Sequence, residues 1–177
     1  LSLDLRGSEV ITTQNSVDGD DPFYARFAVD RDLSTFSHTG WRTLEQRTNP
    51  WWKVDLGGVH CLRKITLINA IHHAHRLEGN VVRAGLNSNH LLNPEIGRVA
   101  ASQTLSRAVI DFTPEPYVIA QYVSVDIHGS DPQTIVQLTE VMVEEVNTAT
   151  TKQAIRKGMD RDSRRMCCKQ RLIIFCN

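Results

Sequence analysis

Residues 48–57 read Thr48-Asn49-Pro50-Trp51-Trp52-Lys53-Val54-Asp55-Leu56-Gly57 and contain two of the three tryptophans of the chain. In a strand, successive side chains point to opposite faces. The alternation therefore predicts two faces, one with Trp51, Lys53 and Asp55 and the other with Trp52, Val54 and Leu56. We predict a strand that stops at Gly57-Gly58, with Trp52 in the core and Trp51 toward a rim. No nucleophile or acid–base pair accompanies this stretch, which favours a binding domain over an enzyme.

The charges divide the chain into two parts. With 177 residues, 41% of them hydrophobic, the chain can form one buried core and carry an additional segment. Residues 1–147 contain 12 Lys and Arg against 18 Asp and Glu, whereas residues 148–177 contain 8 against 2. We therefore predict a mildly acidic domain over residues 1–147 and a basic tail over residues 148–177. This distribution argues against a nucleic-acid binder.

The compartment of the protein is suggested by its apolar runs and its cysteines. No apolar run approaches the roughly 18 residues that cross a bilayer. The chain begins at Leu1 without a signal-peptide core, so a processed secreted chain is one explanation and a trimmed sequence is another. We expect a secreted, extracellular protein. Its four cysteines allow three pairings, among which the sequence does not choose, and a tail cysteine could instead link two chains into an oligomer. They are Cys61, Cys167, Cys168 and Cys176.

The rest of the first 147 residues is a series of short β-prone runs separated by turn residues. We predict strands within residues 8–17, 23–29, 61–69, 77–85, 107–112, 117–127 and 136–146. Residues 86–105 are polar and predict a loop, with room for one short helix. No other helix is predicted before residue 148. This pattern predicts an all-β fold, either an antiparallel sandwich or a barrel.

Several blocks of the sequence follow the order found in one protein family. The most specific are Ser37-His38-Thr39 and the Pro-Trp-Trp-X-Val-Asp-Leu-Gly block from Pro50 to Gly57. Residues 27–30, 65–69, 76–83, 121–125 and 138–143 add weaker matches in the same order. Over about residues 8–146 the chain resembles the F-type lectins, or fucolectins. The resemblance implies a galactose-binding-domain-like jelly-roll β-sandwich of eight antiparallel strands, with a structural Ca²⁺ and a shallow pocket for L-fucose.

The resemblance also assigns sugar-binding residues. In the F-type lectins a histidine holds the axial hydroxyl of the sugar, and two arginines flank a turn with paired cysteines. By this match His38 is the histidine and Arg76 is the second arginine. The turn departs from the family, because Ala70 replaces the first arginine, His72 an aspartate, and His73-Ala74 the cysteine pair. We expect an altered pocket in which His72 or His73 takes the role of the missing arginine.

The missing arginine has an energetic consequence. Deleting a charged hydrogen-bond partner costs about 1.5–3 kcal/mol, which is roughly one to two decades of affinity. We therefore expect either an altered glycan specificity or the loss of monosaccharide binding. The alternative for His38 and Arg76 is a structural role in a loop and at a strand start.

The implied Ca²⁺ site lies in an acidic loop and at the closing strand. The matching residues are Asp30, Asp32, Thr35, Thr139 and Glu140, with Arg31 in the place of a family glycine. Ca²⁺ takes six to eight oxygen ligands from carboxylates, carbonyls and water. Loop-capping hydrogen bonds would explain the same acidic residues without a metal.

The cluster of His72, His73 and His75 has its own alternatives. Imidazole suits Zn²⁺ and Cu²⁺, and the second and third of these histidines would share a face if the segment were extended. The same side chains titrate near pH 6.5 and could make binding acid-sensitive. A solvated loop that lost its lectin residues would also explain them.

A different class of function competes with sugar binding. The related discoidin and coagulation-factor domains bind protein or phospholipid surfaces through apolar loop tips, for which Leu91-Leu92 and Ile71 are the candidates here. The basic tail would attract an anionic surface such as phospholipid or sulfated glycan, and residues 172–175 could pair with an edge strand. We expect a secreted, non-enzymatic recognition protein that binds a fucosylated or other glycan, or a glycoprotein.

Overall fold

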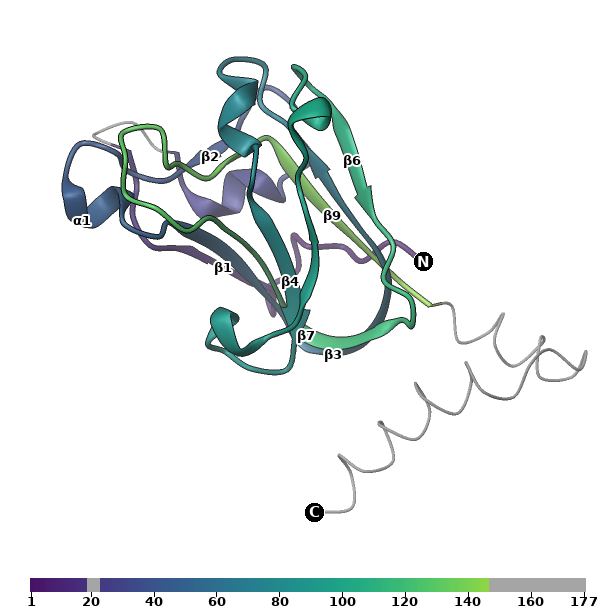
Figure 1. Ribbon diagram of the computed structural model, residues 1–177. Coiled ribbons are helices and arrows are strands. Elements are labelled where there is room, and N and C mark those ends of the chain that lie inside the picture. The colour runs from purple at the N-terminus through teal and green to yellow at the C-terminus, as the bar shows by residue number, and fades with distance from the viewer. Residues whose placement is uncertain (19–22, 147–177) are drawn as a thin grey trace, which may run out of the picture.

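The computed structural model describes residues 1–18 and 23–146. These residues form an antiparallel β-sandwich, and Figure 1 shows the long strand β3 (Trp51–Ile68) bending from one layer into the other. The predicted all-β class is confirmed. The basic tail, its three cysteines and the predicted domain boundary at residue 147 lie outside the described residues.

The described residues contain nine strands and five short helices. The remaining strands are β1 (Ile11–Gln14), β2 (Ser37–His38), β4 (Val81–Gly85), β5 (Glu95–Arg98), β6 (Val109–Phe112), β7 (Val118–Asp126), β8 (Gln137–Leu138) and β9 (Glu140–Glu145). The helices are α1 (Leu44–Arg47) and four 3₁₀ turns, η1 (Ala25–Ala28), η2 (Ala74–Leu77), η3 (His90–Leu92) and η4 (Ala101–Gln103). None of these helices has the length and apolar character needed to cross a membrane.

The two layers share strand β3. The first layer has the order β1-β3-β7-β4-β5, and all of its neighbouring strands are antiparallel. The second half of β3 pairs with β9 and β6, so that Ile65 lies opposite both Val143 and Phe112. A separate ribbon of β2 and β8 places His38 opposite Gln137. This ribbon carries a predicted sugar-binding residue to a part of the chain that is distant in sequence.

The predicted strand end at Gly57-Gly58 is wrong, because β3 continues to Ile68. The glycine pair instead marks an irregularity, where the register with β7 shifts between Asp55 and His60. Gly57 has a φ of +74°, and a Cβ there would lie 2.8 Å from the backbone oxygen of Glu9. Glycine adopts this conformation without the steric cost that other residues incur. The pair therefore allows a single strand to bend between layers.

Alanine substitutions at the two glycines distinguish two effects on the free energy of unfolding. One is the strain of a positive φ, and the other is the general effect of replacing a glycine. Gly57→Ala is expected to lower the free energy of unfolding by about 1–2 kcal/mol, because of its positive φ and the contact with Glu9. Gly58→Ala is the matched control, since the nearest atom to its Cβ would be Nε2 of His60 at 3.7 Å. Urea unfolding followed by tryptophan fluorescence measures both. Equal midpoints for the two variants would contradict this role of Gly57.

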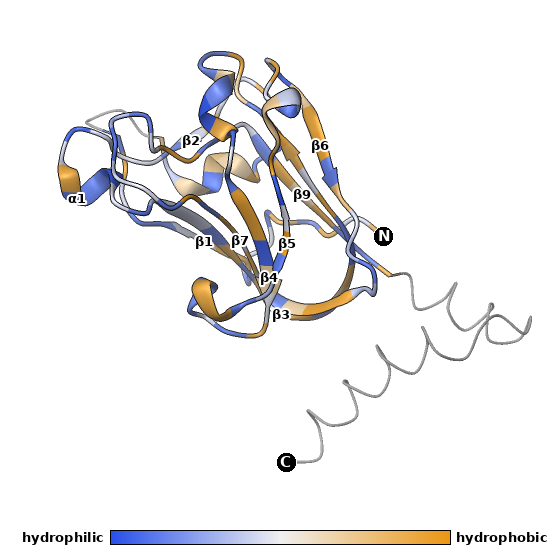
Figure 2. Cartoon of the chain, in the orientation of Figure 1, coloured by the Kyte–Doolittle hydropathy of each residue, from blue (hydrophilic) through white to orange (hydrophobic). Residues whose placement is uncertain are grey.

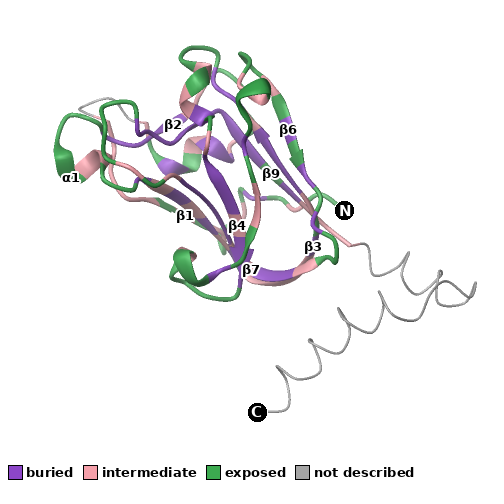
Figure 3. Ribbon diagram, viewed as in Figure 1, coloured by how far each residue is buried: buried purple, intermediate pink, exposed green. Residues whose placement is uncertain are grey.

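The inner face of β3 anchors the core, as the alternation predicts. Trp52, Val54 and Leu56 are buried, whereas Trp51 is half-buried. The Nε1–H of Trp52 donates to the carbonyl oxygen of Ala25 at 2.8 Å, so its polar atom is satisfied inside the core. Figure 2 shows the hydrophobic residues along the strands, and Figure 3 shows the buried segments between the two layers.

Two other segments differ from their predictions. The alternating run of residues 23–29 predicts a strand, but it contains η1, which buries Ala25 and Ala28 on one side of a 3₁₀ turn. Periodicity alone does not separate the two in so short an apolar run. Residues 86–105 contain η3 and η4, where one short helix was allowed, and also β5 at the edge of the sheet.

Candidate functional site

The structure brings His38 and Arg76 into contact. The β2–β8 ribbon positions His38, and η2, which packs against β8, positions Arg76. Nη1 of Arg76 lies 3.1 Å from Nε2 of His38 and 3.4 Å from Oε1 of Gln137. The two sugar-binding residues implied by the resemblance therefore lie side by side, next to a glutamine.

The protonation of His38 follows from its partners. A guanidinium can only donate hydrogen bonds, so Nε2 of His38 accepts and Nδ1 carries the proton. This Nδ1–H donates to the carbonyl oxygen of Thr39 at 2.7 Å. Burial lowers the pKa of His38 below its usual value, and the charge of Arg76 lowers it further, while Thr39 and Asp18 oppose the shift. The site thus holds a neutral imidazole in a fixed orientation.

Several buried polar atoms around this pair lack hydrogen-bond partners. Among residues 1–18 and 23–146, these atoms include Nε of Arg76, Oγ of Ser37 and Oε1 of Gln14. The amide of Gln14 contacts the backbone of the histidine, because its Nε2–H donates to the carbonyl oxygen of His38 at 3.0 Å. Buried polar groups are normally hydrogen-bonded, and leaving them unpaired costs about 1–3 kcal/mol each. Such a cluster is typical of a site that is completed by water or a ligand.

The turn before η2 carries the other predicted sugar residues. His73 has a left-handed backbone with φ of 56°, and its carbonyl oxygen accepts from the N–H of Arg76 at 2.9 Å, so the two residues are neighbours. The charge of Arg76 lowers the pKa of His73. His72 is exposed and has no hydrogen bond within the described part of the chain. Ala70 is buried, so its short side chain offers no polar group to the site. The structure therefore brings His73, but not His72, to the His38–Arg76 pair.

The histidines of this turn do not form a metal cluster. The segment is a turn followed by a 3₁₀ helix and is not extended, so the assumption of a shared strand face is wrong. The rings of His73 and His75 meet edge to face, with centroids 6.1 Å apart. Within residues 1–18 and 23–146, no three His, Cys, Asp or Glu side chains gather closely enough to hold a metal ion. Nothing in this geometry favours a transition-metal site.

The acidic loop and the start of β9 form a second candidate site. Oγ1 of Thr35 lies 2.8 Å from Oδ2 of Asp30 and 2.9 Å from the carbonyl oxygen of Asp32. The backbone N–H of Arg31 donates to Oε2 of Glu140 at 2.9 Å, which ties the loop to β9. Asp30, Thr35 and Glu140 thus come together from two distant parts of the chain.

Glu140 has the properties of a carboxylate that needs a positive partner. It is buried, and burial raises its pKa to about 7, with a further increase from the charge of Asp30. The N–H of Arg31 and the charges of Arg31 and Arg6 only partly oppose this shift. Beside it, the half-buried Asp30 accepts from the N–H of Asp32 and the hydroxyl of Thr35, both at 2.8 Å. A buried carboxylate, a second carboxylate, a hydroxyl and a carbonyl oxygen are ligand types that fit a hard cation such as Ca²⁺.

Two predicted ligands occupy less favourable positions. The carboxylate of Asp32 accepts from the N–H and the hydroxyl of Ser34 at 2.9 and 2.6 Å, so only its carbonyl oxygen belongs to the cluster. Thr139 is buried, and its N–H donates to the carbonyl oxygen of Ile68 at 3.0 Å. The side chains of Asp30 and Glu140 therefore supply the charge of this site.

Comparison with known proteins gives matches only at the level of structure. No protein family and no curated protein is matched by the sequence. The fold is similar to an F-type lectin (fucolectin) from the serum of striped bass, Morone saxatilis, with a TM-score of 0.66 and 22% identity. This alignment covers 82% of the present chain and 48% of the bass lectin, so the chain spans about half of that protein. The present chain has the F-type lectin fold.

Other solved structures with this fold are carbohydrate-binding modules. A fucose-binding module of Streptococcus pneumoniae has a TM-score of 0.60 and 20% identity, over 82% of this chain and 96% of the module. A Clostridium perfringens module of the CBM32 type, solved with GalNAc-β-1,3-galactose, has a TM-score of 0.64 and 16% identity, over 81% of this chain and 99% of the module. The predicted resemblance and the galactose-binding-domain-like sandwich are thereby confirmed.

Some members of the site were not predicted from the sequence. Gln14 donates to the carbonyl oxygen of His38, Gln137 accepts from Arg76, and Asp18 lies 4.0 Å from Nδ1 of His38, while Ser37 precedes His38 in β2. Ser37 belongs to the quoted Ser37-His38-Thr39 block, which was the available signal. The glutamines carry no such signal, because only the pairing of β2 with β8 and the packing of β1 bring them there.

Proposed function

We propose that this protein recognises carbohydrate at the site formed by His38 and Arg76. The observation that carries the proposal is the contact of Nη1 of Arg76 with Nε2 of His38 at 3.1 Å, made by a guanidinium that is only partly buried. A sugar hydroxyl is both donor and acceptor, so it can accept from the Arg76 guanidinium and donate to a neighbouring oxygen such as Oε1 of Gln137. Support comes from the fold, which is shared with lectins and modules whose structures hold Lewis b or galactose.

The expected specificity follows from the altered turn. His73 beside Arg76 can supply one neutral imidazole but not the second charged fork of the family, since Ala70 is buried. Charged, forked donors bind more tightly than neutral ones. We therefore expect a fucosylated or a differently substituted glycan to bind more weakly than in a pocket with two arginines.

Arg76→Ala is expected to lower the affinity for the best glycan by roughly one to two decades, which corresponds to about 1.5–3 kcal/mol for a charged hydrogen bond. Arg98→Ala is the matched control, because this arginine is exposed on β5 and, among the described residues, pairs only with Glu95 and the carbonyl oxygen of Gly79. A glycan array followed by titration calorimetry on the strongest hit measures the effect. A blank array for the Ca²⁺-supplied protein, or equal losses in the two variants, would overturn the proposal.

A structural Ca²⁺ is the second part of the proposed function. Asp30 and Glu140 would hold it with their carboxylates, together with the carbonyl oxygen of Asp32 and the hydroxyl of Thr35. Bound there, the cation would supply the positive charge that the buried Glu140 and its neighbour Asp30 lack. It would fix the loop of residues 30–35 to β9.

The remaining parts of the proposal concern the setting of the protein. We infer a secreted, non-enzymatic recognition protein that carries disulfide bonds. The neighbours in structure are lectins and carbohydrate-binding modules, which supports a binding role. Attraction of the basic tail to an anionic surface falls outside the described residues.

A second candidate function is favoured by one observation, the exposure of Leu91 and Leu92 on η3. Such leucines could insert into a phospholipid or protein surface. Ile71, the third predicted tip, precedes η2, whereas η3 follows β4, so the two tips lie at opposite ends of that strand. One flat surface therefore cannot contact all three.

A further inference from the structure

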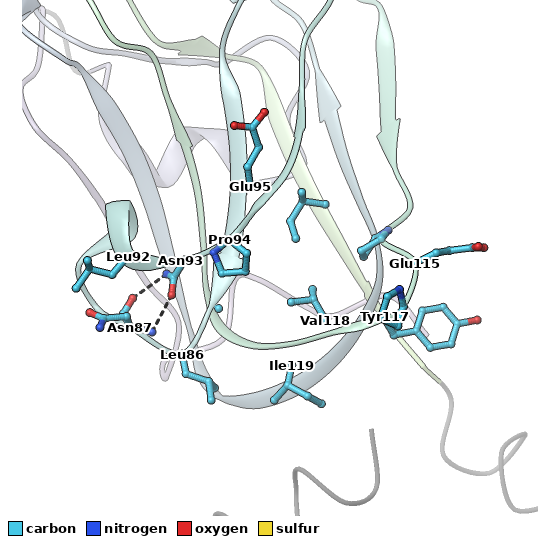
Figure 4. A pocket seen from close by; sticks show the side chains of 14 residues that line it. Leu86, Asn87, Leu92, Asn93, Pro94, Glu95, Glu115, Tyr117, Val118 and Ile119 are labelled. Atoms are coloured by element: carbon cyan, nitrogen blue, oxygen red, sulfur yellow. Dashed lines mark hydrogen bonds between the residues drawn. The ribbon is translucent and has the colours of Figure 1, made fainter. Parts of the chain in front are cut away.

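A long groove lies away from the proposed sugar site. It has a volume of about 790 Å³ and is formed by residues 85–87 and 92–96 on one side and residues 114–119 on the other. Figure 4 shows Asn87 and Leu92 on one side, Glu115 and Tyr117 on the other, and Val118 between them. The groove begins at the last residue of β4, whereas the His38 site uses η2, which precedes β4. The two sites are therefore separate.

The groove is apolar and open in the described structure. Leu86 and Tyr117 each expose 47% of their surface, and Leu92 exposes 68%. Ile96, Val118 and Ile119 continue the apolar lining. Contiguous exposed apolar surface on a soluble domain marks an interaction site more often than isolated residues do.

The charges of the groove favour a basic occupant. Its lining contains Glu95 and Glu115 and no Lys, Arg or His. Both glutamates are exposed, and within residues 1–18 and 23–146 the only side chain paired with either of them is Arg98, 3.4 Å from Glu95. An acidic rim disfavours an anionic lipid surface and attracts lysine or arginine.

The described chain ends near this groove. The N–H of Val146, its last residue, donates to the carbonyl oxygen of Cys61 at 2.9 Å. Cys61 lies directly opposite Ile119 across the β3–β7 pair, and Ile119 lines the groove. Paired strands are about 4.8 Å apart, and β3 lies between Val146 and Ile119, so the described chain ends two strand spacings, about 10 Å, from the groove.

The sequence of that segment complements the groove. Residues 148–177 contain 8 Lys and Arg against 2 Asp and Glu, and Lys169 and Arg171 precede the apolar run Leu172-Ile173-Ile174-Phe175. We propose that residues 169–175 of the same chain dock in the groove, with the apolar run on its floor and the basic residues at Glu95 and Glu115. A tethered segment binds at a high effective concentration. An extended chain spans up to about 3.5 Å per residue, so reach is not limiting.

Hydroxyl-radical footprinting of the full-length chain tests this proposal, because the domain offers matched residues outside the groove. Tyr117 is 47% exposed and Tyr24 43%, while Leu92 is 68% exposed and Leu105 70%. We expect Tyr117 and Leu92 to be modified at least threefold more slowly than Tyr24 and Leu105. The double substitution Leu172→Asp and Phe175→Asp should raise the two groove rates to those of the controls, and it leaves every described residue unchanged.

The other occupants appear as distinct outcomes of the same experiment. Equal rates within each pair in the wild-type chain would show an open groove and overturn the proposal. Protection that persists in the double variant would overturn it in favour of another occupant, and protection that increases with protein concentration would indicate a second copy. Protection that appears only on adding phosphatidylcholine–phosphatidylserine vesicles would indicate a lipid surface. The footprinting rates do not depend on sugar binding, because the groove and the sugar site are separate. A glycan array without any hit would therefore overturn the proposed function and not the docking of residues 169–175.

Discussion

At pH 8, in protein freed of Ca²⁺, Glu140→Gln is expected to be more stable than the wild type by about 3 kcal/mol. Burial raises the pKa of Glu140 from 4.5 to about 7, and each pKa unit corresponds to about 1.4 kcal/mol. A raised folded-state pKa gives stability that is fully present below the unfolded value and is lost as the pH rises through the folded value. The wild-type protein therefore loses this stability between about pH 4.5 and 7, and the neutral amide does not.

Adding Ca²⁺ is expected to reverse this order at pH 8, because the cation neutralises the ionised carboxylate. At pH 5.5 the folded protein keeps the proton on Glu140, so the metal-free difference between the variants should shrink to about 1 kcal/mol. Ca²⁺ must displace that proton, and its affinity should fall about tenfold for each pH unit below 7. Urea unfolding at both pH values, with and without Ca²⁺, measures these effects.

The control for the Ca²⁺ prediction is Asp32→Asn. The carboxylate of Asp32 is engaged with Ser34 and contributes only its carbonyl oxygen to the cluster, so this change should leave the Ca²⁺ effect nearly intact. If the metal-free wild type and Glu140→Gln unfold at the same urea concentration at pH 8, and Ca²⁺ changes neither, the site is a hydrogen-bonded loop and not a metal site.

Trp52→Ala is expected to lower the free energy of unfolding by about 3–5 kcal/mol, the usual cost of removing a large aromatic side chain from a packed core. Trp52 is fully buried between the layers, and its loss also leaves the carbonyl oxygen of Ala25 without a partner. A change of this size is a large fraction of the total stability of a domain. The midpoint of urea unfolding should move strongly, with little change in the slope.

Trp51→Ala is the matched control for this prediction. Trp51 is half-buried and contacts the ring of His90 and the ammonium of Lys53, so its removal should cost only about 1 kcal/mol. If Trp52→Ala does not yield folded protein, Trp52→Phe keeps an aromatic ring in the core but loses the indole N–H and part of the ring volume. We expect that variant to cost about 1–2 kcal/mol. Similar losses for Trp51→Ala and Trp52→Ala would contradict the assignment of inner and outer faces.

Much of the fold was predictable because local pattern and burial agree. The alternation from Trp51 to Leu56 assigns the inner and outer faces of β3 correctly, since strand geometry leaves no other arrangement. The pattern fails at Gly57-Gly58 because glycines mark both strand ends and bends. A strand continues through a glycine bend when partner strands pair with it beyond the bend. The strand β3 continues because β7, β9 and β6 all pair with its second half.

The candidate sites were predictable only in part. The resemblance pointed to His38, Arg76, Asp30 and Glu140, which the fold does bring together in pairs. It could not show that Asp32 turns to Ser34, because that depends on the local loop conformation.

By itself, the sequence determined the strand at Trp51–Leu56, the all-β class and the likeness to F-type lectins, because alternation and residue order are local properties. Only the tertiary structure decided which polar atoms remain unpaired beside Arg76 and how far Glu140 is buried. It also decided where the chain leaves the domain relative to the groove. These features arise from contacts between strands far apart in sequence, and hydrogen bonding and desolvation depend on such contacts and not on residue type alone.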